Sequence, residues 1–125
     1  MSFSTKETDL AYLAGFIDGE GCFFIGRFQT IARPGAKSYP NYHTLIYITN
    51  TDKGVLEWIH ERFGGTLDNR ERPTRKGNIL RQIYRLSYTG NLLTDLTKAL
   101  LPYLVYKKPH AQTMLRMRST FARNR

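Results

Sequence analysis

The stretch from Leu13 to Gly21, LAGFIDGEG, constrains the fold of this chain more than any other part of its sequence. Small residues recur every four positions, at Ala11, Gly15 and Gly19, so on a helix they form one face with almost no side-chain volume. A glycine in the middle of a helix costs about 1 kcal/mol relative to alanine, so Gly15 requires a packing reason. We therefore expect a second helix to approach closely along this face.

Two carboxylates, Asp18 and Glu20, lie at the C-terminal end of the expected helix, where the helix dipole favours cations. Their charge requires a positive partner, which is either a divalent metal ion with oxygen ligands or an Arg or Lys side chain. The large apolar residues of the same helix leave it without a clearly polar face. Neighbours are therefore expected on both of its sides.

Hydrophobic periodicity, together with glycine and proline breaks, predicts the element order α-β-β-α-β-β-α, followed by a last helix. The expected helices span about 9–19, 53–63, 92–101 and 109–118, and the expected strands about 22–29, 42–50, 66–72 and 79–88. Asp52 is the expected N-cap of the second helix, and Gly64 and Gly65 are expected to end it. The fold class is α+β: a four-stranded antiparallel sheet with helices on one face and the other face free. A length of 125 residues indicates one domain, 1–125.

The composition favours a polyanionic partner. The chain has 19 basic and 10 acidic residues, a net charge of +9 and a pI near 9.9. Nucleic acid is the expected polyanionic partner, although the charge alone fits ribosome-like or membrane-surface binding equally well. The sequence contains no apolar run of membrane-spanning length and no signal peptide, so we expect a soluble, intracellular protein without a membrane partner. The single cysteine, Cys22, excludes an intrachain disulfide and a cysteine-based zinc site.

The positive charge is concentrated in the two expected hairpins. They carry nine of the 19 basic residues and two of the 10 acidic ones, and a two-stranded ribbon fits the major groove of DNA. Tyr39, Tyr42 and Tyr47 lie in the same region and can stack on bases, pack within the protein or contact phosphates. The candidate DNA-binding residues are Arg27, Gln29, Arg33, Lys37, Arg70, Arg72, Arg75, Lys76, Arg81, Gln82 and Arg85.

The stretch 13–21 resembles the signature of the LAGLIDADG homing endonucleases. Most of its residues match the family name, namely Leu13, Ala14, Gly15, Ile17, Asp18 and Gly21, whereas Phe16, Gly19 and Glu20 replace Leu, Ala and Asp. The order of elements, the basic hairpins and the chain length extend the resemblance over nearly the whole sequence.

The resemblance implies a saddle-shaped homodimer. In this family two motif helices pack through their small-residue faces and place one acid from each beside the scissile phosphates. This chain has one motif, so the expected partner is a second copy, with Ala11, Gly15 and Gly19 at the dimer interface. No small-molecule substrate is expected.

The resemblance also implies which residues form the site. The family holds its metal with the acid that precedes the last motif glycine, here Glu20, and the Gly19 carbonyl is a further expected metal ligand. Asp18 is expected to be a structural hydrogen-bond acceptor. Asn50 and Lys107 occupy the places of the residues that orient water and stabilise charge on the phosphate. The expected cofactor is Mg²⁺, or another divalent cation such as Mn²⁺.

The resulting hypothesis is a site-specific homing endonuclease of the kind that supports intron homing. Such an enzyme makes a metal-dependent double-strand break in a long pseudo-palindromic DNA site, inside an organelle (chloroplast or mitochondrion) or in prokaryotic cytoplasm. The alternative is a cleavage-inactive nucleic-acid-binding module, either an intron-splicing maturase or a DNA-binding regulator, on the same fold. A small basic RNA-binding structural protein would explain the charge but not the glycine face.

Overall fold

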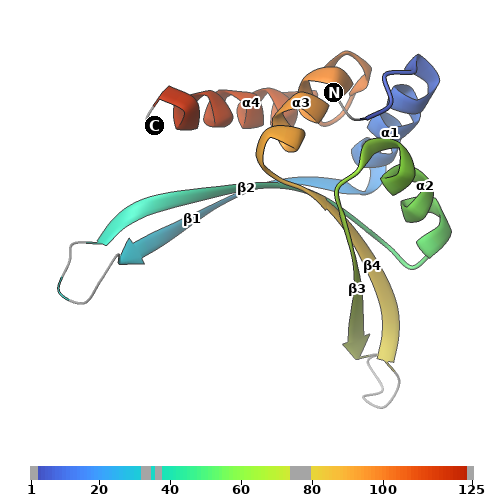
Figure 1. Ribbon diagram of the computed structural model, residues 1–125, viewed down its shortest axis with the longest axis horizontal. Helices are drawn as coiled ribbons and strands as arrows, with labels where there is room; N and C mark the ends of the chain where they lie inside the picture. Colours follow the sequence, from blue (N-terminus) through green and yellow to red (C-terminus); the bar gives the residue numbers. More distant parts are fainter. Residues whose placement is uncertain (1–2, 32–34, 36–37, 74–79, 124–125) are drawn as a thin grey trace.

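The computed structural model describes residues 3–31, 35, 38–73 and 80–123, and within these ranges it leaves out the side chains of 28–31, 38–40, 70–73, 80–81 and 122–123. The order of elements confirms the prediction (Figure 1). The helices are α1 (Glu7–Glu20), α2 (Lys53–Phe63), α3 (Gly90–Leu100), the short 3₁₀ helix η1 (Leu101–Tyr103) and α4 (Lys108–Arg123). The strands are β1 (Gly21–Ile31), β2 (Ser38–Asn50), β3 (Thr66–Pro73) and β4 (Leu80–Tyr88). Among the described residues, no helix is both long and apolar enough to cross a membrane.

The four strands form one antiparallel sheet in the order β1-β2-β4-β3. The two hairpins share only a short seam, in which Ile46–Asn50 of β2 pairs with Tyr84–Tyr88 of β4. Beyond this seam the hairpins extend in different directions, and all the helices lie on the same side of the sheet (Figure 1). The expected free sheet face is therefore present.

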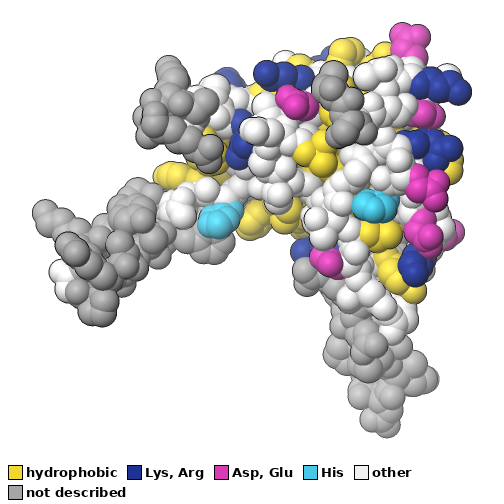
Figure 2. Space-filling view, in the orientation of Figure 1, with side chains coloured by type: hydrophobic (Ala, Val, Ile, Leu, Met, Phe, Trp, Pro, Cys, Tyr) yellow, Lys and Arg dark blue, Asp and Glu magenta, His cyan; other side chains and the backbone are white. Residues whose placement is uncertain are grey.

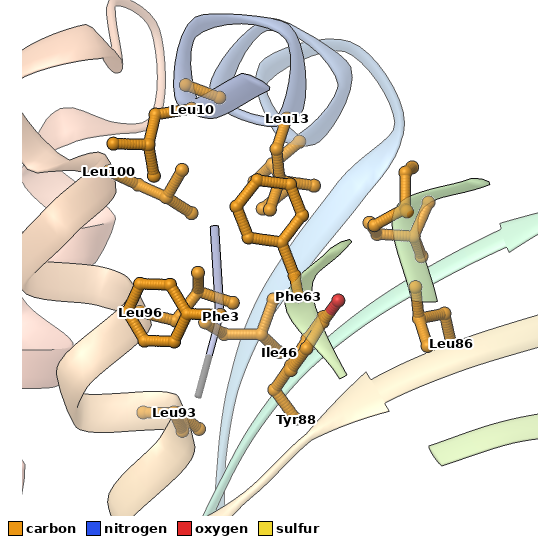
Figure 3. Packing of buried hydrophobic residues seen from close by; sticks show 14 of the residues in the cluster. Phe3, Leu10, Leu13, Ile46, Phe63, Leu86, Tyr88, Leu93, Leu96 and Leu100 are labelled. Atoms are coloured by element: carbon orange, nitrogen blue, oxygen red, sulfur yellow. The ribbon is translucent and has the colours of Figure 1, made fainter. Parts of the chain in front are cut away.

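The core lies between the helices and the seam of the sheet. Side chains from α1, α2, α3 and the sheet converge there (Figure 3), and those of Leu13, Phe63, Leu96, Ile46 and Leu86 are fully buried. On the opposite side of α1, the small residues at 11, 15 and 19 are exposed. Among the described residues, α1 is therefore covered on one side only, which leaves its small-residue face open to the second neighbour expected from its sequence.

The second helix begins and ends as its sequence predicts. The Asp52 carboxylate accepts hydrogen bonds from the backbone N–H groups of Gly54 (2.9 Å) and Val55 (3.4 Å), which confirms it as the N-cap. Gly64 and Gly65 follow the helix with φ values of +70° and +93°. A side chain at Gly65 would also be too close to the backbone of β4, because its Cβ would lie 2.8 Å from the Ser87 carbonyl oxygen.

Alternation along the strands defines the two faces of the sheet. Ile46, Ile48 and Leu86 are fully buried under the helices, so the residues between them point to the other side. The open face, defined here as the sheet face turned away from the helices, includes Cys22, Phe24, Leu45, Tyr47 and Arg85. Any partner that contacts the free face of the sheet meets these residues.

Candidate functional site

The motif helix ends at its second acid. The Gly21 backbone N–H donates to the Ile17 carbonyl, and Gly21 then takes an extended conformation (φ −87°, ψ 170°) that starts β1. Glu20 is thus the last residue of α1, slightly later than the predicted end at Asp18 or Gly19. Gly19 and Glu20 are both exposed at this junction of helix and sheet.

Asn50 and Glu20 are in direct contact. The Asn50 Nδ2 group donates a 2.8 Å hydrogen bond to Glu20 Oε2, which joins the end of β2 to the end of α1. Asn50 Oδ1 accepts a second 2.8 Å bond from the Asp52 backbone N–H. Both ends of the amide are engaged, so its orientation is fixed and it holds the carboxylate in one place.

The first acid of the motif, Asp18, has a structural role, as predicted. Its two carboxylate oxygens accept 2.8 Å hydrogen bonds from the backbone N–H groups of Val105 and Lys107. Partial burial, the largest single influence, raises the pKa of Asp18, but the backbone hydrogen bonds from Lys107, Val105 and Tyr106 together outweigh it. The net pKa therefore lies below its ordinary value, and Asp18 holds this loop as a carboxylate.

Lys107 is the positive partner at the end of α1. Its ammonium donates 3.0 Å hydrogen bonds to the carbonyl oxygens of Ile17 and Asp18, at the negative end of the helix dipole. Its third N–H donor has no acceptor among the described residues and can serve another group. The structure thus brings Glu20, Asn50 and Lys107 to the same end of α1, although the three lie far apart in the sequence.

The segment before Lys107 contains a feature that sequence reasoning missed. Val105 and Tyr106 are 84% and 72% exposed, which is unusual for large apolar side chains next to a polar site. A usable signal was present, because these residues lie between Pro102 and Pro109 and outside any helical repeat.

The exposed end of α1 has oxygen atoms that suit a hard divalent cation. Glu20 Oε1 accepts no hydrogen bond from the described residues, while Oε2 is held by Asn50. Mg²⁺ usually takes one or two carboxylates together with water and phosphate oxygens. Nowhere in the described ranges do three or more His, Cys, Asp or Glu side chains form a group able to hold a metal ion. A metal ion held here by Glu20 and the Gly19 carbonyl would therefore take its remaining ligands from water, from phosphate or from a second chain.

The candidate DNA-binding residues divide into three groups. Arg33, Lys37, Arg75 and Lys76 lie outside the described residues, and only the backbone is described for Gln29, Arg70, Arg72 and Arg81. The side chains of Arg27, Gln82 and Arg85 are described.

The strand register places these three described side chains on different faces of the sheet. Arg27 alternates in step with Phe23 and Ile25, which pack toward the helices, and Gln82 alternates in step with the buried Leu86. Arg85 alone of the three belongs to the open face, where its guanidinium lies over the Tyr47 ring.

Comparison with known proteins identifies the family. The sequence model described as LAGLIDADG endonuclease matches residues 13–115, from the start of the motif to the middle of α4. The chain belongs to the LAGLIDADG endonuclease family. The match includes Glu20, Asn50 and Lys107 of this LAGLIDADG chain. No curated protein matches its sequence.

Solved structures show the same fold at low identity. The homing endonuclease I-CvuI, in complex with the I-CreI target and 2 mM Mg, is 21% identical with a TM-score of 0.65, over 88% of this LAGLIDADG chain and 65% of its own. The archaeal intron-encoded homing endonuclease I-Vdi141I, complexed with DNA, is 20% identical with a TM-score of 0.66, over 94% and 70% of the two chains. I-SmaMI, bound to an uncleaved DNA target with calcium ions, is 21% identical with a TM-score of 0.59, over 94% and 39%. The chain thus spans about 65% of the length of the first of these relatives.

Proposed function

We propose that this chain is a site-specific homing endonuclease. It acts as a homodimer and makes a double-strand break in a long pseudo-palindromic DNA site by metal-dependent hydrolysis. The observation that carries the proposal is the Glu20–Asn50 hydrogen bond of 2.8 Å at the end of the motif helix, next to the Lys107 ammonium. Three structural relatives that were solved with DNA support a duplex as the substrate.

Each residue of the site has a separate role in this proposal. Glu20 and the Gly19 carbonyl hold a divalent cation, which when bound activates water and stabilises the leaving 3′ oxygen. Asn50 orients the Glu20 carboxylate and can also hold the attacking water. The free N–H of Lys107 donates to a phosphate oxygen and stabilises the charge that develops on it.

The homodimer follows from the number of acids. One chain has one motif and therefore one Glu20, whereas cutting two strands requires an acid at each scissile phosphate. The exposed face formed by Ala11, Gly15 and Gly19 allows the α1 helices of two copies to approach closely, which brings their two Glu20 side chains near each other. We propose that 1–125 acts as a single endonuclease domain in each copy.

Replacement of Glu20 by Gln tests the proposal. Glu20→Gln removes the charge but keeps an oxygen that can accept from Asn50, so the local structure should persist. With DNA made by joining the two flanks of the gene, we expect Mg²⁺-dependent cleavage by the wild type and a loss of about a hundredfold or more in Glu20→Gln, with binding retained. Glu57→Gln, an exposed change on α2, is the matched control and should cleave normally.

Two outcomes would redirect the assignment. Normal cleavage by Glu20→Gln would show that Glu20 is not the metal ligand. Tight, specific binding by the wild type without cleavage in either Mg²⁺ or Mn²⁺ would instead favour the cleavage-inactive binding module, whether maturase or regulator.

A further inference from the structure

A tyrosine and an arginine are stacked near the centre of the open face. The guanidinium carbon of Arg85 lies 4.3 Å from the centroid of the Tyr47 ring. Tyr47 on β2 pairs with Cys22 of β1 on one side and Ser87 of β4 on the other. Arg85 lies two residues before Ser87 on β4, so it reaches the ring as a diagonal cross-strand neighbour.

The ring on which Arg85 lies is half-buried between its neighbours in the sheet. Hydrogen bonding to the Cys22 thiol is the first cause that raises the pKa of Tyr47 above its ordinary value, followed by the charge of that thiol and by burial. Tyr47 therefore has Cys22 of β1 opposite it in the sheet, and Arg85 covers one face of its ring. A side chain stacked on such a ring has fewer accessible rotamers, so it loses less freedom when it binds a ligand.

Arg85 has hydrogen-bonding capacity that the described chain does not use. Its Nε atom is buried and has no hydrogen-bond partner among the described residues. Asp68 lies directly opposite on β3, yet these two described side chains form no ion pair. A buried donor without a partner is unfavourable. Since Nε is closed to a ligand, a ligand would instead accept from the terminal nitrogens of this partly exposed side chain.

The position of Arg85 in the sheet favours contact with bases over contact with phosphates. β4 is an inner strand, with β2 and β3 on its two sides. In the row of Arg85, β4 lies between Thr49 of β2 and Asp68 of β3. Three strands spaced about 4.8 Å apart are about 10 Å wide, against about 12 Å for the major groove, so the middle strand faces the base edges and the outer strands face the backbone. Arg85 also pairs with Thr49, the residue before Asn50, which places it close to the Glu20 site.

We propose that Arg85, held against Tyr47, reads a guanine in the major groove of each half-site, a few base pairs from the bond that the Glu20 site would cut. This inference rests on the proposed function, because it names the base that one residue of the DNA surface recognises. Two neighbouring acceptors of guanine, O6 and N7, match the fork of an arginine, which makes this pairing the commonest specific contact in the groove.

Selection of bound duplexes from a random-sequence library, in Ca²⁺ and with the full chain, tests the inference. We expect the wild type to select a guanine at one symmetric position near the centre of the site. Arg85→Gln should lose that preference by about 5- to 150-fold and shift it toward adenine, which pairs with Gln, while other positions keep their bases. Arg116→Gln is the matched control, since Arg116 is exposed on α4, on the helix side of the sheet, and it should leave this position unchanged.

The selection experiment distinguishes a failure of the guanine contact from a failure of the proposed endonuclease function. A wild type that selects and cuts a site while Arg85→Gln selects the same bases would refute the guanine contact alone, whereas a wild type that selects no sequence would refute both. A uniform loss of binding in Arg85→Gln, with the salt slope lowered by about 1, would indicate a phosphate contact and overturn the inference. Arg85→Lys is the second variant, for use if Arg85→Gln does not fold. It keeps the positive charge but lacks the two-pronged guanidinium, so it should lose the same preference for guanine.

Discussion

At the scale of single residues, the two acids of the motif have different tasks. Asp18 accepts backbone hydrogen bonds from residues 87 and 89 positions later in the chain, Val105 and Lys107. This contact holds the Lys107 ammonium on the last carbonyl oxygens of α1. Glu20 receives a hydrogen bond only from the Asn50 amide among the described residues, so one of its oxygens is left for a metal ion. Asp18 is therefore a positioning residue in this proposal, and Glu20 is the ligand.

Replacement of Asp18 by Ala measures the strength of this anchor. Asp18→Ala removes two hydrogen bonds from backbone N–H groups to a carboxylate, so we expect a loss of about 1.5–3 kcal/mol in the free energy of unfolding, nearer the lower figure because the site is partly exposed. Urea denaturation is the measurement. Glu57→Ala removes an exposed carboxylate from α2 and should change the stability by less than about 0.5 kcal/mol.

The same pair of proteins gives a pH test with a definite sign. The pKa of Asp18 is lowered in the folded chain, so its carboxylate stabilises the folded state at pH values above its unfolded pKa of about 3.9. The stability difference between wild type and Asp18→Ala should be full at neutral pH and shrink as the pH falls through the lower folded pKa. A difference that grows toward acid pH would contradict the proposed anchor.

At the scale of elements, the corner between β2 and α2 holds the site in place. Asn50 ends β2 and contacts Glu20, and two residues later Asp52 caps α2. The Asp52 backbone N–H also donates to Asn50 Oδ1, so the start of the helix and the orientation of the Asn50 amide depend on the same turn. A stable α2 therefore contributes to the geometry of the site.

Removal of this cap should weaken α2 by a predictable amount. Asp52→Ala loses the two bonds to Gly54 and Val55 and should lower the free energy of unfolding by about 1 kcal/mol, whereas Asp52→Asn keeps an acceptor and should cost only a few tenths. Thermal unfolding followed by circular dichroism measures both. Equal losses in the two variants would show that the charge of Asp52, and not its cap bond, stabilises the helix.

The elements were largely predictable from the sequence because each carries a local signal. Periodic apolar residues, Asp52 and the pair Gly64–Gly65 predicted the order and most of the ends. The last helix was predicted too short, since α4 continues to Arg123, beyond the expected end near Arg118. No glycine or proline follows Pro109 in this segment to stop it.

Local sequence signals could not predict which side of each strand faces the helices, nor which distant segments of the chain contact each other. Phe23, Phe24 and Ile25 are consecutive apolar residues, so alternation alone could not say which side of β1 faces the helices. The pairing of Phe23 with the buried Ile46 shows that Phe23 faces the helices. The same register places Arg27 on the helix side of the sheet and Arg85 on the open face. The anchor from Asp18 to Val105 likewise has no local pattern, because it depends on how α1 packs against the loop before α4.

At the scale of the whole molecule, acidic and basic side chains are concentrated in different regions. Seven of the 10 acidic residues lie between residues 7 and 61, and Figure 2 shows most of the visible acidic side chains on the side formed by α1 and α2. The hairpins carry most of their charge as Arg and Lys, and α4 contains no acidic residue. DNA is therefore expected to approach the sheet, where the field is positive, and to meet few carboxylates there apart from Asp68 and the Glu20 site.

The bare face of α1 makes the homodimer testable without disturbing the fold of the single chain. Gly15 is exposed and a Cβ built there has no atom within 4 Å, so Gly15→Leu fits one chain and also favours the helix. We expect the variant to fold at least as stably but to sediment as a monomer, because the added side chain keeps two α1 helices apart. Double-strand cleavage should be lost with it, since each copy supplies one Glu20. Asp95→Leu, which places the same leucine side chain at an exposed position of α3, should remain dimeric, and a Gly15→Leu protein that still sediments as a dimer would contradict the interface.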